Sequence, residues 1–244
     1  MKDFQTGIII RIFDSGANDK IIHFINTDGE KVSALAKSVR KSTSSKQSAI
    51  EIGNKIKVKL ILGYNLPILS SVKIISENLA WKSDYEKTII LQMICEVMEI
   101  FSHEAIIEKD FFQVLDHTLG IKKLTKPKLL LAIFLLKILK ISGHISELRT
   151  DVVSGDALSA DNSYESLDHI GYISGKTESH YKSKANVRIQ KSQSFILNNS
   201  VFASSKLALE DAEINQMLKL HIHWIELLAE KELKSKKVVL RGLG

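Results

Sequence analysis

Residues 52–62 read IGNKIKVKLIL, and within this stretch apolar and basic side chains alternate. The alternation puts three apolar side chains on one face of an extended chain and three ammonium groups on the other: Ile56, Val58 and Leu60 against Lys55, Lys57 and Lys59. Successive side chains of a β-strand point to opposite sides. The pattern therefore predicts a strand with one face in an apolar core and a positively charged outer face.

Other short β-rich runs lie on both sides of this stretch, separated by turn residues. Asp28-Gly29, which favours a hairpin, separates two of them. A polar segment, residues 37–48, precedes the quoted stretch. The runs are residues 8–13, 21–25, 31–36 and 68–75. Five strands with a long excursion after the third favour a small barrel of the oligonucleotide-binding (OB) type, with an SH3-like barrel as the alternative.

After Glu77 the apolar residues recur with helical spacing. Thr125 is expected to cap the third of the helices, with Pro127 in its first turn and Gly143 after its end. Residues 149–200 are polar, and we expect a partly mobile excursion with at most one short strand or helix. The helices are predicted over residues 89–101 and 111–119, between the cap Thr125 and Gly143, and over residues 214–228.

The predicted fold class is multidomain α+β. A five-stranded OB-fold β-barrel in residues 1–78 precedes an all-α helical domain in residues 79–244. That domain contains the polar excursion, and its amphipathic C-terminal helix is followed by a basic tail.

Composition excludes several classes of protein. The longest apolar run, residues 129–136, is far shorter than the roughly 20 residues that span a bilayer, and the first residues do not form a secretory signal. Cys95 is the only cysteine, so no internal disulfide forms, and its expected role is that of a small buried apolar residue. We predict a cytoplasmic protein without a membrane partner, a cofactor or a small-molecule substrate.

The net charge of +6 is concentrated in the first third of the chain. Residues 31–59 hold eight basic residues against the single acid Glu51. A concentrated positive field favours polyanions, nucleic acid above all, although a lysine-rich solvated face is the ordinary alternative. The predicted nucleic-acid contacts in this region are Arg11, Lys31, Lys37, Arg40, Lys41, Lys46, Lys55, Lys57 and Lys59. Phe13, Phe24 and Tyr64 are the candidates for base stacking, with core packing favoured for Phe24.

No catalytic signature is present, and we predict that the chain is not an enzyme. It has no phosphate-binding loop, no nucleophile elbow and no HExxH motif. His221 and His223 point about 200° apart on a helix, so they do not bind one metal ion together, and His221 is expected in the core. Glu96 and Glu99 are expected on the solvent side of their helix.

Four phrases carry a resemblance to a known family. They are Gly7–Arg11 (GIIIR), Lys31–Lys41 (KVSALAKSVRK), Leu136–Leu148 (LKILKISGHISEL) and Leu233–Lys237 (LKSKK). In their order and spacing the chain resembles the bacterial RecO recombination mediators. The phrase KVSALAK followed by two basic residues is the most specific of the four.

The resemblance implies a function in recombinational DNA repair in a bacterium, at the nucleoid. Members bind single- and double-stranded DNA, promote annealing of complementary strands, and help load the recombinase onto DNA coated by single-stranded DNA-binding protein. Their protein partners are RecR and the acidic, apolar C-terminal tail of that coating protein. An RNA- or ribosome-associated OB protein is the alternative, because phosphate attraction ignores the 2′-hydroxyl.

The family's DNA contacts carry over to matching positions of this chain. In the barrel they are Lys37, Arg40 and Lys41, and in the tail Lys236 and Lys237. A pocket for the acidic tail peptide needs an apolar floor and a cationic rim. Close to Phe111, Phe112 and Leu129, the residues Lys122, Lys123, Lys126 and Lys128 are candidates for that rim.

One departure from the family concerns zinc. Many members carry a zinc module that begins with CxxCG after the phrase that here is Ser146-Glu147-Leu148. This chain has Asp151-Val152-Val153-Ser154-Gly155, so the glycine is present and both thiolates are replaced. Asp and Ser do not reproduce a tetrahedral thiolate site. We predict no zinc and a looser segment over residues 149–186.

Overall fold

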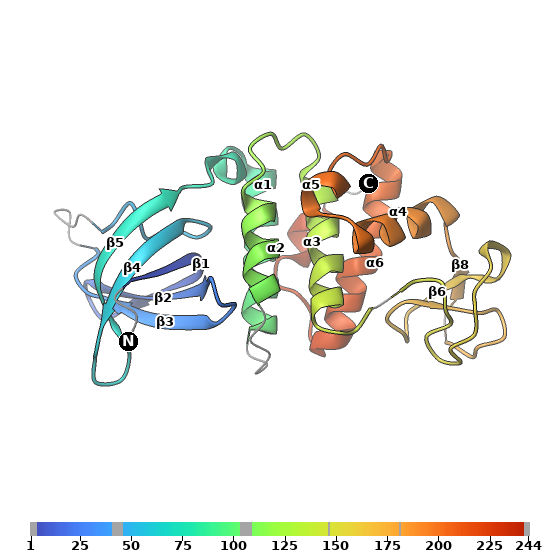
Figure 1. Cartoon of the computed structure of the whole chain (residues 1–244), viewed down its shortest axis with the longest axis horizontal. Coiled ribbons are helices and arrows are strands. Elements are labelled where there is room, and N and C mark those ends of the chain that lie inside the picture. The colour runs from blue at the N-terminus through green and yellow to red at the C-terminus, as the bar shows by residue number, and fades with distance from the viewer. Residues whose placement is uncertain (1–3, 41–45, 103–108, 146, 181, 242–244) are drawn as a thin grey trace. The chain divides into compact units, whose positions relative to one another are not determined.

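The computed structural model describes residues 4–40, 46–102, 109–145, 147–180 and 182–241 (Figure 1). By its internal contacts the chain forms two compact units, Met1–Leu124 and Thr125–Gly244. The first unit therefore includes two helices that the sequence placed in the helical domain.

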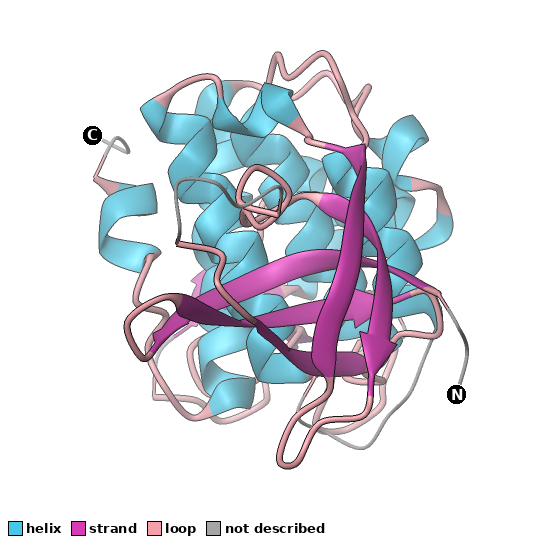
Figure 2. Ribbon diagram, turned by 90° about the vertical axis from the view of Figure 1, so that its left-hand side faces the viewer, coloured by secondary structure: helices cyan, strands magenta, loops and turns pink. Residues whose placement is uncertain are grey.

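The first unit is built on a closed barrel of five strands, whose order is β1-β2-β3-β5-β4. β1 is antiparallel to both β2 and β4, and the single pair Leu35 and Ile68 joins β3 to β5 in parallel. The strands are β1 (Gln5–Ser15), β2 (Asp19–Asn26), β3 (Lys31–Ala36), β4 (Lys55–Ile61) and β5 (Ile68–Ser76). This arrangement, drawn in magenta in Figure 2, confirms the predicted five-stranded barrel of OB type.

The alternation in residues 52–62 determines which way β4 faces. Ile56, Val58 and Leu60 lie in the barrel core, packed with Phe24 of β2. Gly7 of β1 lies over that ring, and a Cβ atom there would come within 2.4 Å of it. A larger residue at position 7 would therefore force β1 and β2 apart at this point.

The outer face of β1 is also buried. Ile8 and Ile10 point away from the barrel core, yet they are at most 3% exposed because α1 (Tyr85–Phe101) packs on β1. Asp84 caps α1 by accepting a hydrogen bond from the Lys87 N–H. This packing attaches the helix to the barrel.

The other elements of this unit are η1 (Leu79–Lys82) and α2 (Lys109–Leu119). Trp81 in η1 is fully buried and donates from Nε1 to the Leu119 carbonyl at 3.1 Å, which ties the two elements together. Gly120 follows the end of α2, as the sequence predicted. Cys95 of α1 is buried, and this burial raises the pKa of its thiol to about 12, in keeping with an apolar role.

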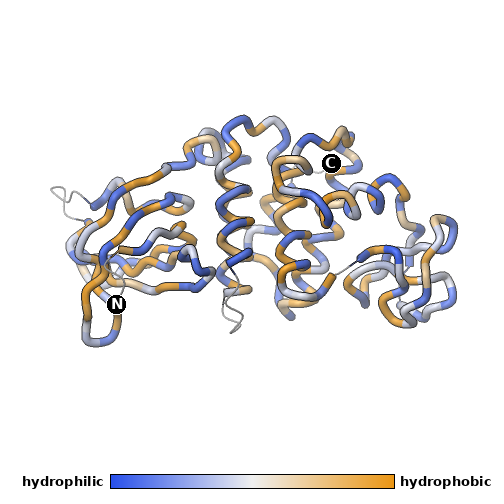
Figure 3. Tube along the Cα trace, viewed as in Figure 1, coloured by the Kyte–Doolittle hydropathy of each residue, from blue (hydrophilic) through white to orange (hydrophobic). Residues whose placement is uncertain are grey.

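The second unit is centred on α3 (Pro127–Ile141), which is buried on nearly all sides and packs against α6 (Asp211–Ala229). Figure 3 shows the apolar character of α3 in orange. α4 (Val187–Asn198), α5 (Val201–Ser204) and α7 (Lys236–Leu240) complete the helices of this unit. Pro127 opens α3 as predicted, but the capping position is Lys126 and not Thr125. In the described part of the chain no helix is long and apolar enough to cross a membrane.

The polar segment over residues 149–200 contains more structure than the sequence predicted. A small sheet, ordered β7-β6-β8, is followed by the helix α4, so the expectation of one short element was wrong. The strands are β6 (Tyr164–Ser166), β7 (Tyr172–Ile173) and β8 (Lys182–Lys184). Tyr172 and Ile173 of β7 are both completely buried and give this segment an apolar centre.

A hydrogen-bonded chain links this sheet to the helices. Tyr172 donates from its hydroxyl to Gln193 of α4 at 2.6 Å, and the Gln193 amide donates to His221 Nε2 at 2.8 Å. His221 in turn donates from Nδ1 to the Ala132 carbonyl of α3 at 2.8 Å. His221 is fully buried, as predicted, and stacks on Trp224, whereas His223 contacts the Leu167 carbonyl. The two histidines therefore have separate partners.

Candidate nucleic-acid interface

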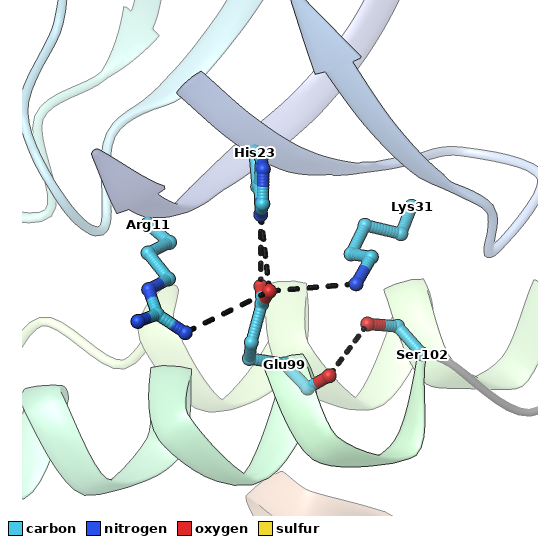
Figure 4. Close-up of polar contacts among 5 residues, drawn as sticks. All are labelled: Arg11, His23, Lys31, Glu99 and Ser102. Carbon is cyan, nitrogen blue, oxygen red and sulfur yellow. Dashed lines mark hydrogen bonds and ion pairs between the residues drawn. The ribbon is translucent and has the colours of Figure 1, made fainter. Parts of the chain in front are cut away.

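Two of the predicted DNA contacts surround a carboxylate of α1. Glu99 is only 8% exposed, and its side chain meets three basic groups of the barrel, one from each of β1, β2 and β3 (Figure 4). His23 donates from Nδ1 to its oxygens at 3.0 and 3.3 Å. Lys31 Nζ lies 3.4 Å from Glu99 Oε1, and Arg11 Nη1 lies 3.9 Å from the same atom. We call this arrangement the Glu99 cluster.

The Glu99 cluster corrects two expectations. Glu99 does not lie on the solvent side of its helix, because the barrel covers that side. The ammonium group of Lys31 points toward the carboxylate, and its side chain is 11% exposed. A charge held this way is already neutralised, so Lys31 contributes less to a positive outer field than the sequence suggested.

Lys55 is engaged in the same manner by α2. Its ammonium group lies 2.7 Å from Asp116 Oδ2 and 5.6 Å from the centre of the Phe112 ring. Both side chains of the ion pair are about three-quarters buried. Lys55 thus joins β4 to α2, although it shares the outer face of β4 with Lys57 and Lys59.

The loop that follows β3 holds four more of the predicted contacts. Arg40 Nη1 lies 3.4 Å from Asp14 Oδ2, with both groups well exposed. Lys46 donates to the Leu69 carbonyl at 2.8 Å, whereas Lys37 is exposed. Lys41 lies outside the described residues. Within the described residues these early cations have different surroundings, because Lys31 and Lys55 are paired with helix carboxylates whereas Lys37 is exposed.

A second set of cations lies on the outer face of the β4–β5 hairpin. Lys57 and Lys59 of β4 point outward, and Lys73 of β5 stands directly opposite Lys57. The Phe4 ring, 48% exposed, lies beside them, with Lys57 Nζ 5.3 Å and Lys59 Nζ 5.8 Å from its centre. Within the described residues no carboxylate pairs with any of these three lysines. We call Phe4, Lys57, Lys59 and Lys73 the open face.

Sequence reasoning missed two members of the open face, Phe4 and Lys73. Lys73 had a local signal, because it is the one charged residue in the β-rich run 68–75. Phe4 stands just before the first strand, and nothing local indicates that its ring lies beside two lysines some fifty residues later.

The three stacking candidates fall in different environments. Phe24 is fully buried in the barrel core, as favoured. The Arg11 guanidinium lies 4.4 Å from the centre of the Phe13 ring, and the His23 ring packs against Phe13 in a T-shaped contact. Phe13 therefore lies next to the Glu99 cluster. Tyr64, in the β4–β5 loop, is fully exposed. Figure 1 shows this loop extending past the ends of the two strands.

The lysines proposed for the tail-peptide pocket belong to both units. Lys122 and Lys123 are exposed in the first unit. In the second, Lys126 donates to the Leu209 carbonyl at 2.6 Å, and Lys128 is half-buried. In the basic tail, Lys236 is paired with Glu226 at 2.6 Å and Lys237 is exposed.

The residues at the position of the zinc module do not fit a zinc ion. Asp151 is 1% exposed, and its carboxylate accepts hydrogen bonds from the backbone N–H groups of Val153 and Ser174 at 2.9 and 2.7 Å and from the Thr177 hydroxyl. Burial alone would raise its pKa, but these donors outweigh burial and hold the pKa of Asp151 well below its usual range. The carboxylate is thus occupied by donors that organise the loop, and a metal ion would have to displace them.

The structure and the site define a class of protein, namely an OB-type barrel with a charged outer face followed by a helical region. Comparison with known families gives the particular one. Residues 1–78 match the family described as Recombination protein O N terminal, and residues 82–237 match Recombination protein O C terminal. The chain belongs to this RecO family, whose function lies in DNA repair and recombination.

Relatives carry the same name. The DNA repair protein RecO of Dehalococcoides mccartyi is 29% identical over 173 residues, which cover 70% of this chain and 68% of the relative. The DNA repair protein RecO of Staphylococcus aureus is 27% identical over 175 residues, again 70% of this chain and 68% of the relative.

Proposed function

We propose that this chain is a non-catalytic DNA-binding recombination mediator. It binds single- and double-stranded DNA, promotes annealing of complementary strands, and helps load the recombinase onto DNA coated by single-stranded DNA-binding protein. Membership in the RecO family supports this proposal. The structural observation that carries it is the open face, where three lysines stand together without a carboxylate partner in the described chain.

The open face suits a phosphate backbone for electrostatic reasons. Lys57 and Lys59 are two residues apart on one strand, so their positions are separated by about 6.6 Å along it. Phosphates that bind there release condensed counterions, so affinity should fall steeply as salt rises. Such contacts do not read sequence. They match a protein that acts on DNA of any sequence and brings two strands together.

The first test measures annealing of complementary DNA coated by single-stranded DNA-binding protein. We expect Lys57→Ala/Lys59→Ala to slow annealing and to reduce the slope of log affinity against log salt by about 2. A matched control removes two exposed lysines of the second unit, Lys176→Ala/Lys231→Ala, and should change neither value. Equal effects of the two double variants would contradict the assigned surface.

The loop after β3 is tested in the same way. The family positions Lys37, Arg40 and Lys41, changed together to Ala, should reduce the salt slope by about 2 to 3. Arg40 is paired with exposed Asp14, an ion pair weak enough for a phosphate to replace. An unchanged slope would remove this loop from the DNA-binding surface. Lys236 and Lys237 are further proposed contacts, tested by the corresponding pair of Ala variants.

The proposed protein partners are RecR and the C-terminal tail of single-stranded DNA-binding protein. Calorimetric titration with a synthetic tail peptide tests the second. If Lys126 and Lys128 form the rim, Lys126→Glu/Lys128→Glu abolishes the heat of binding, whereas Lys122→Glu/Lys123→Glu tests the exposed pair of the first unit. Unchanged binding by both variants would exclude these lysines as the site.

RNA binding is the second candidate function, because the open face contacts phosphates and stacks bases without reading the 2′-hydroxyl. Competition between single-stranded DNA and RNA of the same sequence separates the two. A clear preference for RNA would favour an RNA-associated role over recombination.

A further inference from the structure

We infer that Phe4 is a base-stacking platform and that it gives the open face a preference for single-stranded over duplex DNA. This inference rests on the proposed function. It assigns a role to a residue outside the basic run and names which form of DNA this face selects.

The position of the Phe4 ring is set by strand register. Gln5 pairs with Val58 and Thr6 pairs with Lys57, so Phe4 stands beside Lys59 at the start of β1. The two ammonium groups lie 5.3 and 5.8 Å from the ring centre, within the range of a cation–π contact. The lysines hold the ring, yet half of its surface remains exposed. If the role of Phe4 were only to pack against the barrel, its ring would be buried, but Phe4 is 48% exposed.

The lysines around the Phe4 ring favour the binding of an anion. Lys57 and Lys73 face each other across β4 and β5, and like charges directly opposite each other destabilise a sheet. No carboxylate of the described residues relieves this repulsion. A phosphate bound between the two lysines would do so, and the ring beside them offers a surface for the attached base.

The combination fits a single strand better than a duplex. In a duplex the bases are paired and stacked on one another, so only phosphates reach the lysines. In a single strand each base has an exposed face, and stacking on an aromatic side chain contributes about 1–3 kcal/mol per base without regard to sequence. Tyr64 and Leu62, both strongly exposed, lie in the β4–β5 loop a few residues after Lys59. The strand would therefore run from the lysines past Phe4 toward Tyr64.

Binding of oligo-dT and of a duplex of equal length by Phe4→Leu tests the preference. Leu keeps the apolar packing but removes the π face. We expect the affinity for oligo-dT to fall about tenfold, and the affinity for duplex and the salt slope to stay unchanged. Lys57→Ala/Lys59→Ala should instead weaken binding of both and lower the slope. Equal losses for oligo-dT and duplex in Phe4→Leu would overturn the inference.

Phe4→Trp provides a direct readout. The native tryptophans, Trp81 and Trp224, are fully buried, so fluorescence quenched by oligo-dT beyond that of the wild type reports the new side chain. We expect strong quenching by oligo-dT and none by an abasic strand of the same charge. Binding of oligo-dT without quenching would remove Phe4 from the site while leaving the proposed function intact. If the wild type binds neither single strands nor duplex, the proposed function itself fails.

Discussion

The Glu99 cluster and the open face both contain basic side chains of the same barrel, but these side chains have different partners. In the Glu99 cluster, a helix brings a buried carboxylate against Arg11, His23 and Lys31. On the open face, the lysines of β4 and β5 have no such partner in the described chain. The difference shows that the role of a barrel cation depends on whether a later helix supplies an acid.

β4 contains both situations within one strand. Lys55 and Lys57 are two residues apart and point to the same side, yet Lys55 binds Asp116 of α2, whereas the ammonium group of Lys57 lies over the Phe4 ring. The first lysine holds a helix against the barrel, and the second is available to an external anion.

Replacement of Glu99 should have the largest effect. Glu99→Gln keeps the size of the side chain but leaves three basic groups around a site without negative charge. Removing one partner of a buried ion pair costs about 3–5 kcal/mol, and we expect a loss near the lower limit because Gln retains an oxygen acceptor. Urea unfolding followed by the fluorescence of Trp81, in a Trp224→Phe background, measures the loss in the first unit.

Glu96→Gln is the matched control, because it removes the same charge three residues earlier on α1 at a more exposed position. It should cost less than about 1 kcal/mol. If the two variants were equally stable, the Glu99 cluster would not hold α1 on the barrel, and the distinction between the two faces would be lost.

The stability of the second unit should depend on pH through His221 of α6. Burial lowers the pKa of His221 to about 4, while the unfolded chain takes up a proton near pH 6.5. As the pH falls from 6.5 to 4 the unfolded state binds a proton that the folded state excludes, so the free energy of unfolding should drop by about 3 kcal/mol. Above pH 7 this contribution is complete and constant.

Unfolding followed by Trp224 fluorescence in a Trp81→Phe background measures this dependence, since Trp224 stacks on His221. His221→Gln should be less stable at pH 7 and should show a shallower loss between pH 6.5 and 4. A slope equal to that of the wild type would mean that other groups govern the acid sensitivity of this unit.

Lys55 and Lys57 allow a direct test within one strand. Lys55→Ala should cost about 1 kcal/mol of stability, because its ion pair with Asp116 is partly buried, and should leave the salt slope of DNA binding unchanged. Lys57→Ala should leave stability unchanged and lower the slope by about 1. Thermal unfolding and a salt titration of both variants provide the comparison. The opposite assignment of effects would show that α2 does not occupy Lys55 in solution.

Local patterns were enough to predict the barrel and the main helices. The alternation around Val58 and the stripe along α1 each arise within one element, and the resulting faces follow from geometry alone. The expectation for Glu99 failed because the barrel covers the side of α1 that carries this residue. Ile8 and Ile10 were a signal for this, since a strand apolar on both faces needs a cover on each.

The remaining features of the site depend on contacts between distant residues. Phe4 meets Lys57 and Lys59 only because β1 closes the barrel against β4, and no spacing in the sequence predicts that register. Likewise, Asp151 gathers donors that are distant in sequence, from Val153 to Thr177, within the segment 149–200. The composition of this segment shows that its residues are polar, but it does not show that they form hydrogen bonds with one another.

The smallest effect distinguishes stability from function on the open face itself. Lys73→Thr removes the charge opposite Lys57 and places a residue with high β propensity on β5, so we expect the free energy of unfolding to rise by a few tenths of a kcal/mol. The same substitution should weaken DNA binding and lower its salt slope by about 1. Lys73→Arg, which keeps the charge, should change neither value appreciably. A gain in stability together with a loss of binding would mean that the repulsion between Lys57 and Lys73 is kept because DNA relieves it. Higher stability with unchanged binding would instead make Lys73 an ordinary surface lysine, and the open face would then consist of β4 and Phe4 alone.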